Sequence, residues 1–268
     1  MKLVVIVRAL PDPDLAARAF AGAAGLTLAE ARFRLAPEPP ALLARLGPDE
    51  AALMVAALRE AGVAALELDP RVPSDEDRTV ARSLAIAESG VTFTPRSGDP
   101  LAVAWPDVLA VLRGARASRS DVERTERSKR LSLGAAVATG GLVVTRMSTR
   151  TVRSSEESVE QVILVYARDG RAALLAEHEL AFSCLGPRMS PSSTANMAEL
   201  ARTLRERATG AYYDERLLRL GRRALPLLAG GESRTRTATS TKTRTDTSGS
   251  LDLLAEVMRQ ALVRGLLP

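Results

Sequence analysis

The chain offers few side chains that could act as nucleophiles or metal ligands. It contains one Cys and one His, Cys184 and His178, which lie six residues apart. A Cys/His nucleophile pair needs a shaped, electropositive site around the thiol, and no orienting amide is evident beside these two residues. The single Cys excludes a disulfide framework and a Cys-based zinc site, and the single His excludes a multi-His cluster. The pattern favours a buried Cys and a surface His.

Other catalytic and cofactor motifs are also missing from the sequence. The acidic run Asp75-Glu76-Asp77 lacks the spacing of a calcium loop and is typical of a solvated linker. There is no phosphate-binding Gly-rich loop ending in Lys-Ser/Thr, no dinucleotide fingerprint after a strand, and no Gly-x-Ser-x-Gly. We therefore expect a protein that is not an enzyme, with no metal, no cofactor and no small-molecule substrate.

Positive charge is concentrated in one stretch of the 268-residue chain. The formal net charge is +5, but residues 113–153 hold ten Lys/Arg and three Asp/Glu. This stretch indicates an acidic partner, either nucleic acid or an anionic membrane surface, unless it is a solvated loop that keeps the protein soluble. Aromatic residues make up only 3%, which argues against stacking on single strands. The candidate basic patch comprises Arg116, Arg119, Arg124, Arg127, Lys129 and Arg130.

No segment has the pattern of a secretion signal or a membrane span. Charged residues follow the first apolar run too closely for a signal core. The longest apolar run, residues 131–144, has fourteen residues and three Gly, whereas a spanning helix needs about 20 apolar residues. We expect a cytoplasmic protein.

The elements that must position any binding site begin with a compact unit at residues 1–70. A β-branched run at 3–7 predicts a strand, and Asp12 or Asp14 is placed to cap the helix that follows. Gly25 is a natural helix stop. A second helix over 26–35, an extended link near 41–46, a helix from Pro48 and a strand over 63–68 complete the unit.

Three motifs in this unit resemble the C-terminal domain of the bacterial ribosomal stalk protein. The motifs are Gly-Leu-Thr-Leu-Ala-Glu-Ala-Arg at 25–32, Pro-Pro-Ala-Leu-Leu at 39–43 and Leu-Arg-Glu-Ala-Gly-Val at 58–63. The resemblance covers about 70 of the 268 residues and implies a small α/β sandwich. The same arrangement also occurs in adaptor domains outside the ribosome.

The resemblance also implies a protein-binding face on the first two helices. In the stalk family, basic and apolar residues there contact translational GTPases. The matching positions are Arg18, Gly25, Leu26 and Arg32. Ala21 and Ala29 stand where the family usually has cations. The alternative is that these helices carry only the fold.

Residues 78–225 predict a second, β-rich domain. Short alternating runs are separated by turn signals about every ten residues, and an Asp169-Gly170 hairpin signal lies among them. A helix beginning at Ser190-Pro191 follows. In element order alone, the domain resembles a pleckstrin-homology-like antiparallel barrel capped by a C-terminal helix. A plain antiparallel sheet capped by a helix is the alternative.

The remaining residues predict a flexible tether and a terminal helix. Residues 230–250 are rich in Thr and Ser and poor in apolar residues, so we expect a disordered linker. Residues 251–268 predict an amphipathic helix, which either binds a partner or docks on its own domain. The sequence thus indicates an α+β protein that acts as a non-enzymatic adaptor, binding a protein through the N-terminal domain and the terminal helix. A ribosome- or nucleic-acid-associated factor and a membrane-surface module are the alternatives.

Overall fold

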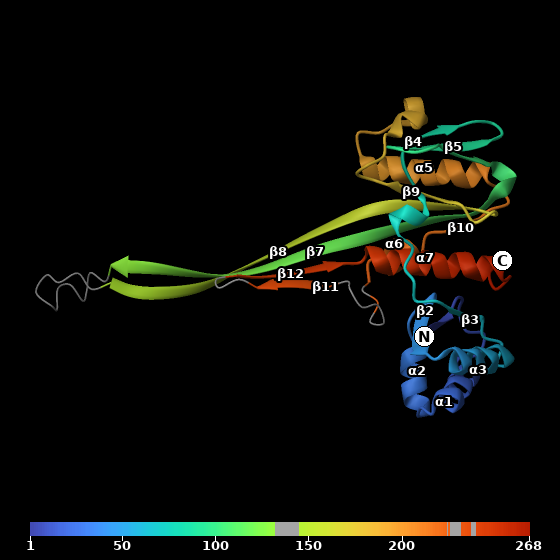
Figure 1. Cartoon of the computed structure of the whole chain (residues 1–268), viewed down its shortest axis with the longest axis horizontal. Coiled ribbons are helices and arrows are strands. Elements are labelled where there is room, and N and C mark those ends of the chain that lie inside the picture. The colour runs from blue at the N-terminus through green and yellow to red at the C-terminus, as the bar shows by residue number, and fades with distance from the viewer. Residues whose placement is uncertain (132–144, 224, 226–231, 237–239) are drawn as a thin grey trace, which may run out of the picture.

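The computed structural model describes the chain except for residues 132–144, 224, 226–231 and 237–239; the side chains of residues 121–153 and 226–245 also lie outside the description. The protein mixes helices and strands, which confirms the α+β class. Figure 1 shows its layers: a group of helices, a small sheet, a single helix, and a large sheet whose strands lie on either side of one more helix. A long arm projects from the large sheet.

The N-terminal unit has the predicted order of elements, and its extended link is a strand. The antiparallel sheet runs β2-β1-β3, with the helices on one face. Val4 and Ile6 pack under the helices, whereas Leu3 and Val5 face the opposite way, as the two-residue period of a strand requires. The elements are β1 (Lys2–Ile6), α1 (Pro13–Ala24), α2 (Leu28–Leu35), β2 (Ala41–Leu46), α3 (Pro48–Glu60) and β3 (Ala65–Leu68).

The large sheet is open in the part of the chain that is described, so the barrel prediction is wrong. Its order is β11-β12-β7-β8-β9-β4-β5-β6, and β10 joins β7. The β4–β9 and β10–β7 pairs are parallel, so the plain antiparallel sheet is also incorrect. The strands are β4 (Thr79–Ile86), β5 (Gly90–Pro95), β6 (Leu101–Ala104), β7 (Val108–Leu131), β8 (Thr145–Ala167), β9 (Ala172–Ala176), β10 (Tyr212–Asp214), β11 (Glu232–Arg236) and β12 (Ser240–Asp246).

Helices on both faces explain why the sheet does not need to close. Helix α5 (Ser193–Arg207) packs on one face through Met197, Leu200 and Leu204, and α7 (Ser248–Val263) covers the other. When both faces of an open sheet are buried, only the backbone hydrogen-bonding groups of its edge strands still need partners. The short helix α6 (Leu217–Leu220) and the 3-10 turns η1 (Asp75–Asp77), η2 (Trp105–Asp107) and η3 (Phe182–Arg188) complete the body.

The basic stretch at residues 113–153 lies largely on two long strands, β7 and β8. Strands β7 and β8 pair in one register from Ala110–Tyr166 out to Leu131–Thr145, and together they form the arm seen at the left of Figure 1. The predicted tether also contains strands, because β11 and β12 form a hairpin that pairs with β7. Alternating Thr residues have a high strand propensity, and the free edge of β7 supplies the hydrogen-bond partners that a composition argument does not consider.

Helix α7 docks in cis, so it is not a free partner-binding peptide. It lies between the two sheets in Figure 1, and its side chains share one core with Leu3 of β1 and Leu164 of β8. Gly114 of β7 permits this approach, because a Cβ there would lie 2.4 Å from Leu251 Cδ1. The buried residues of α7 are Ser250, Leu251, Asp252, Leu253, Leu254, Ala255, Val257, Met258 and Ala261.

A buried ion pair ties α7 to the segment that joins the two sheets. Arg78 Nη1 lies 2.7 Å from Asp252 Oδ1, and the two side chains are 4% and 10% exposed. Arg78 Nη2 also lies 2.7 Å from Asp75 Oδ1. Burial raises the pKa of the Asp252 carboxyl, and the Arg78 guanidinium opposes that shift. Removing either partner would leave the other desolvated and underpaired.

We predict that Asp252→Asn lowers the free energy of unfolding by about 3 kcal/mol, the lower end for a broken buried pair because Asp75 still contacts Arg78. Urea titration measures the change. The control is Arg202→Ala, which breaks a largely exposed pair with Glu199 and should cost less than about 1 kcal/mol. Equal losses for the two variants would contradict a structural role for the buried pair.

A second buried carboxylate joins β9 to α5. Glu177 is 6% exposed and follows the last residue of β9. Its Oε1 accepts hydrogen bonds of 2.6 Å from the hydroxyls of Ser193 and Thr194. Its Oε2 accepts one of 3.0 Å from the backbone N–H of Gln161. Burial raises the pKa of Glu177, but these hydrogen bonds outweigh burial, so the pKa lies below its ordinary value.

We predict that Glu177→Gln destabilises the fold at neutral pH by about 1.5–3 kcal/mol, the usual worth of hydrogen bonds to a charged group. Because the folded pKa is lowered, this contribution is present above the unfolded pKa of roughly 4.3 and disappears as the pH falls through the folded value. Unfolding curves from pH 7 to pH 3 measure the difference in the free energy of unfolding between the Glu177→Gln variant and the unaltered protein. A difference that stays constant over this range would refute the assignment.

Candidate interaction surfaces

Two large apolar side chains of the outer helices are exposed. Phe33 of α2 is 81% exposed, and Leu15 of α1 is 47% exposed. Phe33 stands between Arg32 and Arg34, both exposed. We call Leu15, Arg18, Leu26, Arg32 and Phe33 the helical face. It belongs to the layer of helices farthest from the large sheet in Figure 1.

Local capping interactions fix the two helices of this face. The Asp12 side chain accepts hydrogen bonds of 3.0 Å from the amides of Asp14 and Leu15, which identifies it as the cap. Gly25 ends α1 at φ 63°, the left-handed region that favours glycine. Thr27 and Glu30 then form a capping box that starts α2. The turn between the helices is therefore set by the residues at its own ends.

Electrostatic contacts hold α1 and α2 together across this turn. Arg32 Nη2 lies 2.9 Å from Asp14 Oδ1, with both side chains exposed. Hydrogen bonds from the Thr27 amide and hydroxyl lower the pKa of the Glu30 carboxyl. Arg32 is therefore partly engaged within the chain, whereas Arg18 is exposed and has no ion-pair partner among the described residues. Leu26 is half-buried against the core under the helices.

The four residues predicted from the stalk resemblance lie on α1 (Arg18), on α2 (Arg32) and in the turn between them (Gly25 and Leu26). The sequence reasoning missed Phe33 and Leu15, which add the exposed apolar area. A signal for Phe33 was present: Leu28, Ala31 and Leu35 mark the inward side of α2, and Phe33 falls outside that stripe.

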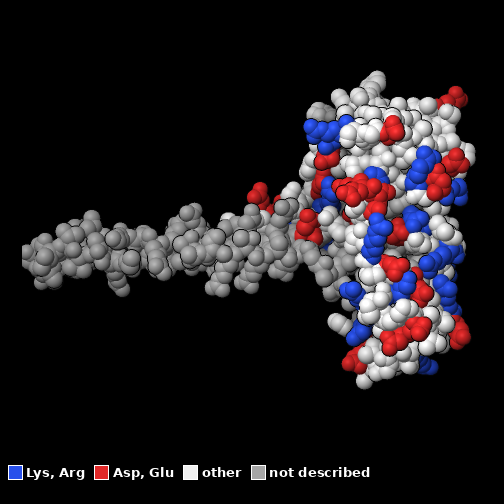
Figure 2. All heavy atoms as spheres, viewed as in Figure 1, with Lys and Arg blue, Asp and Glu red and all other residues white. Residues whose placement is uncertain are grey.

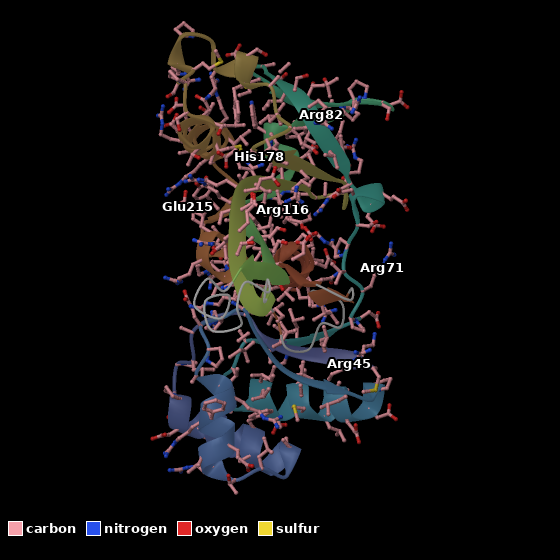
Figure 3. All side chains as sticks on the ribbon, turned by 90° about the vertical axis from the view of Figure 1, so that its left-hand side faces the viewer. Arg45, Arg71, Arg82, Arg116, His178 and Glu215 are labelled. Carbon is pink, nitrogen blue, oxygen red and sulfur yellow. The ribbon has the colours of Figure 1, made fainter. Side chains whose placement is uncertain are left out.

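The predicted basic patch is divided by the structure. Arg116 Nε donates a 2.7 Å hydrogen bond to Glu160 Oε2, and the His178 amide donates one of 3.2 Å to Glu160 Oε1. Figure 3 shows Arg116 and His178 close together at the base of the arm. Arg119 is exposed and takes part in interactions of its own. The other four residues occupy positions on β7 whose side chains lie outside the description: Arg124, Arg127, Lys129 and Arg130.

A cavity of about 420 Å³ opens between β3, the joining segment and α7. Its charged residues are largely paired with one another: Lys2 with Asp69, Arg71 with Asp77, and Arg259 with Glu256. Arg71 can be found in Figure 3. The cavity is therefore lined largely by local ion pairs, each formed within the N-terminal unit, the joining segment or α7.

Cys184 and His178 lie in different surroundings in the structure. Cys184 packs against the core beneath α5, and burial raises the pKa of its thiol, so the reactive thiolate is disfavoured. His178 is exposed. In the described parts of the chain, no group of three or more His, Cys, Asp or Glu side chains could hold a metal ion. Likewise, none of the described helices has the length and apolarity needed to cross a bilayer.

Three comparisons with known proteins add no relative to this picture. No family model matches the chain, and neither the curated proteins nor the solved structures contain a match.

Proposed function

We propose that the protein is an adaptor that binds a protein partner through the helical face. The observation that carries the proposal is the exposure of the Phe33 side chain, which is 81% exposed although it lies on a well-formed helix, α2. Few residues dominate the binding energy of an interface, and an aromatic anchor that fills a partner's pocket is a typical one. The surrounding cations Arg18 and Arg34 would steer an acidic partner toward the anchor.

The partner that this face fits has an apolar groove with carboxylates at its edge. The resemblance of residues 1–70 to the ribosomal stalk domain supports a translational GTPase as that partner. Helix α7 takes no part in the proposed interaction, because its apolar residues are buried between the two sheets. Binding is thereby assigned to the N-terminal unit alone, and the large sheet packs behind it on the other side of α7.

We predict that Phe33→Ser weakens the affinity for a translational GTPase at least tenfold, since truncation of an anchor residue costs more than about 1.4 kcal/mol. The measurement is surface plasmon resonance with the full chain and a panel of purified translational GTPases. The stability should change by less than about 0.5 kcal/mol, because the side chain is exposed.

The matched control is Met189→Ser, which removes an exposed apolar side chain from the body, 56% exposed, and should leave the affinity unchanged. Absence of binding by the unaltered chain to every member of the panel would reject the GTPase partner. Equal losses for the two variants would reject the helical face as the binding surface.

A further inference from the structure

The arm extends far beyond the body as a β-ribbon. Strand β9 pairs with β8 only as far as Val162, which lies opposite Gly114 of β7. Strand β12 accompanies β7 to Arg124, and from Thr125 to Leu131 only β8 pairs with β7. The seventeen residues beyond Gly114 span roughly 55 Å at about 3.3 Å per residue. The outer end of the arm is thus a two-stranded ribbon far from the layers of the body (Figure 1).

The excess positive charge of the protein resides on the outer arm. Residues 123–131 and 145–153, which pair with each other, contain seven of the 37 Lys/Arg and two of the 32 Asp/Glu. The rest of the chain then has 30 basic and 30 acidic residues, so it is neutral. Figure 2 shows acidic and basic side chains interspersed over the visible face of the body. A neutral body with a basic arm indicates that the charge serves the arm rather than general solubility.

The strand register brings like charges together at the outer end. Arg130 is paired with Arg146, one step from the last pair, Leu131 with Thr145. Like charges directly opposite each other destabilise an antiparallel pair. Farther in, Glu126 is paired with Arg150 and Glu123 with Arg153, so residues of opposite charge occupy paired positions there. An external polyanion would convert this repulsion into a favourable interaction.

We propose that the outer arm binds the phosphate backbone of a double-stranded nucleic acid. A groove about 12 Å wide, the major groove of B-form DNA, admits a two-stranded β-ribbon. The basic part of β7, residues 124–131, spans roughly 26 Å at about 3.3 Å per residue, so the contact covers less than one helical turn of about 34–36 Å. Recognition is by phosphate charge and groove shape, because the sequence contains no aromatic residue between Trp105 and Tyr166 that could stack on bases. This activity is independent of the helical face.

The same aromatic-free composition disfavours an anionic membrane. Trp and Tyr are the residues that anchor proteins at the membrane–water interface, and the arm has neither. A duplex offers a regular array of phosphates along both sides of a ribbon, whereas a bilayer offers its phosphates in one plane. The arm carries cations on both strands over the nine residue pairs from Glu123–Arg153 to Leu131–Thr145, and this pattern suits the duplex.

The test is fluorescence anisotropy of a labelled 24-base-pair DNA of random sequence, titrated with the full chain at several salt concentrations. We expect log K to fall with log salt with a slope of about −6, since seven cations each release counterions with a slope of about −0.9. The fourfold variant Arg127→Ser, Lys129→Ser, Arg130→Ser and Arg146→Ser should reduce the slope to about −3. Replacing the same four positions by the opposite basic residue, Arg by Lys and Lys by Arg, should preserve it.

The matched control removes four exposed cations from the body and should leave the slope near −6: Arg8→Ser, Arg45→Ser, Arg96→Ser and Arg207→Ser. Circular dichroism confirms that each variant is folded. Salt-independent binding, or equal slopes for the arm and control variants, would overturn the proposal. So would sedimentation with vesicles containing anionic lipid in the absence of any binding to duplex DNA or RNA. None of these outcomes depends on Phe33 or on a GTPase.

Discussion

The burial of α7 between two sheets is the interaction on which the architecture depends. A helix that is apolar on nearly all sides is stable only when it is covered on nearly all sides. Here the three-stranded sheet supplies one cover, through Leu3 and Val5, and the large sheet supplies the other, through Leu112 and Leu164. Each fully buried Leu, Val or Met side chain contributes about 1.5–3 kcal/mol. Without α7, each sheet would expose an apolar face to water.

This shared core changes the meaning of the two predicted domains. The N-terminal unit has its own core beneath α1, α2 and α3, but the other face of its sheet belongs to the core around α7. The Arg78–Asp252 pair lies at the same junction. The helical face and the arm are therefore displayed by a single packed body, and the distance between them is set by packed layers rather than by a flexible tether.

Sequence reasoning was most successful where local signals decide the structure. Asp12, Gly25 and the Pro48 helix start are set by caps and turns, and the order of the N-terminal elements followed from them. It was wrong where the structure of a segment depends on residues far away in the chain. The Thr-rich residues 240–246 form a strand only because the edge of β7 is free to pair with them, and the role of Gly114 depends on Leu251, which lies far along the chain. Of the proposed site residues, Arg18 and Arg32 came from the resemblance to the stalk domain. The exposure of Phe33 depends on which face of α2 is buried, which requires the whole fold.

The position of α7 in the chain also has a consequence for biosynthesis. During translation, β1 and β3 emerge from the ribosome well before Ser248–Val263, so Leu3, Val5 and Leu66 have no cover while the intervening residues are being made. The nascent protein therefore carries an apolar sheet face for most of its synthesis. That interval is when a chaperone would engage it, and contacts of high sequence separation imply slow final closure.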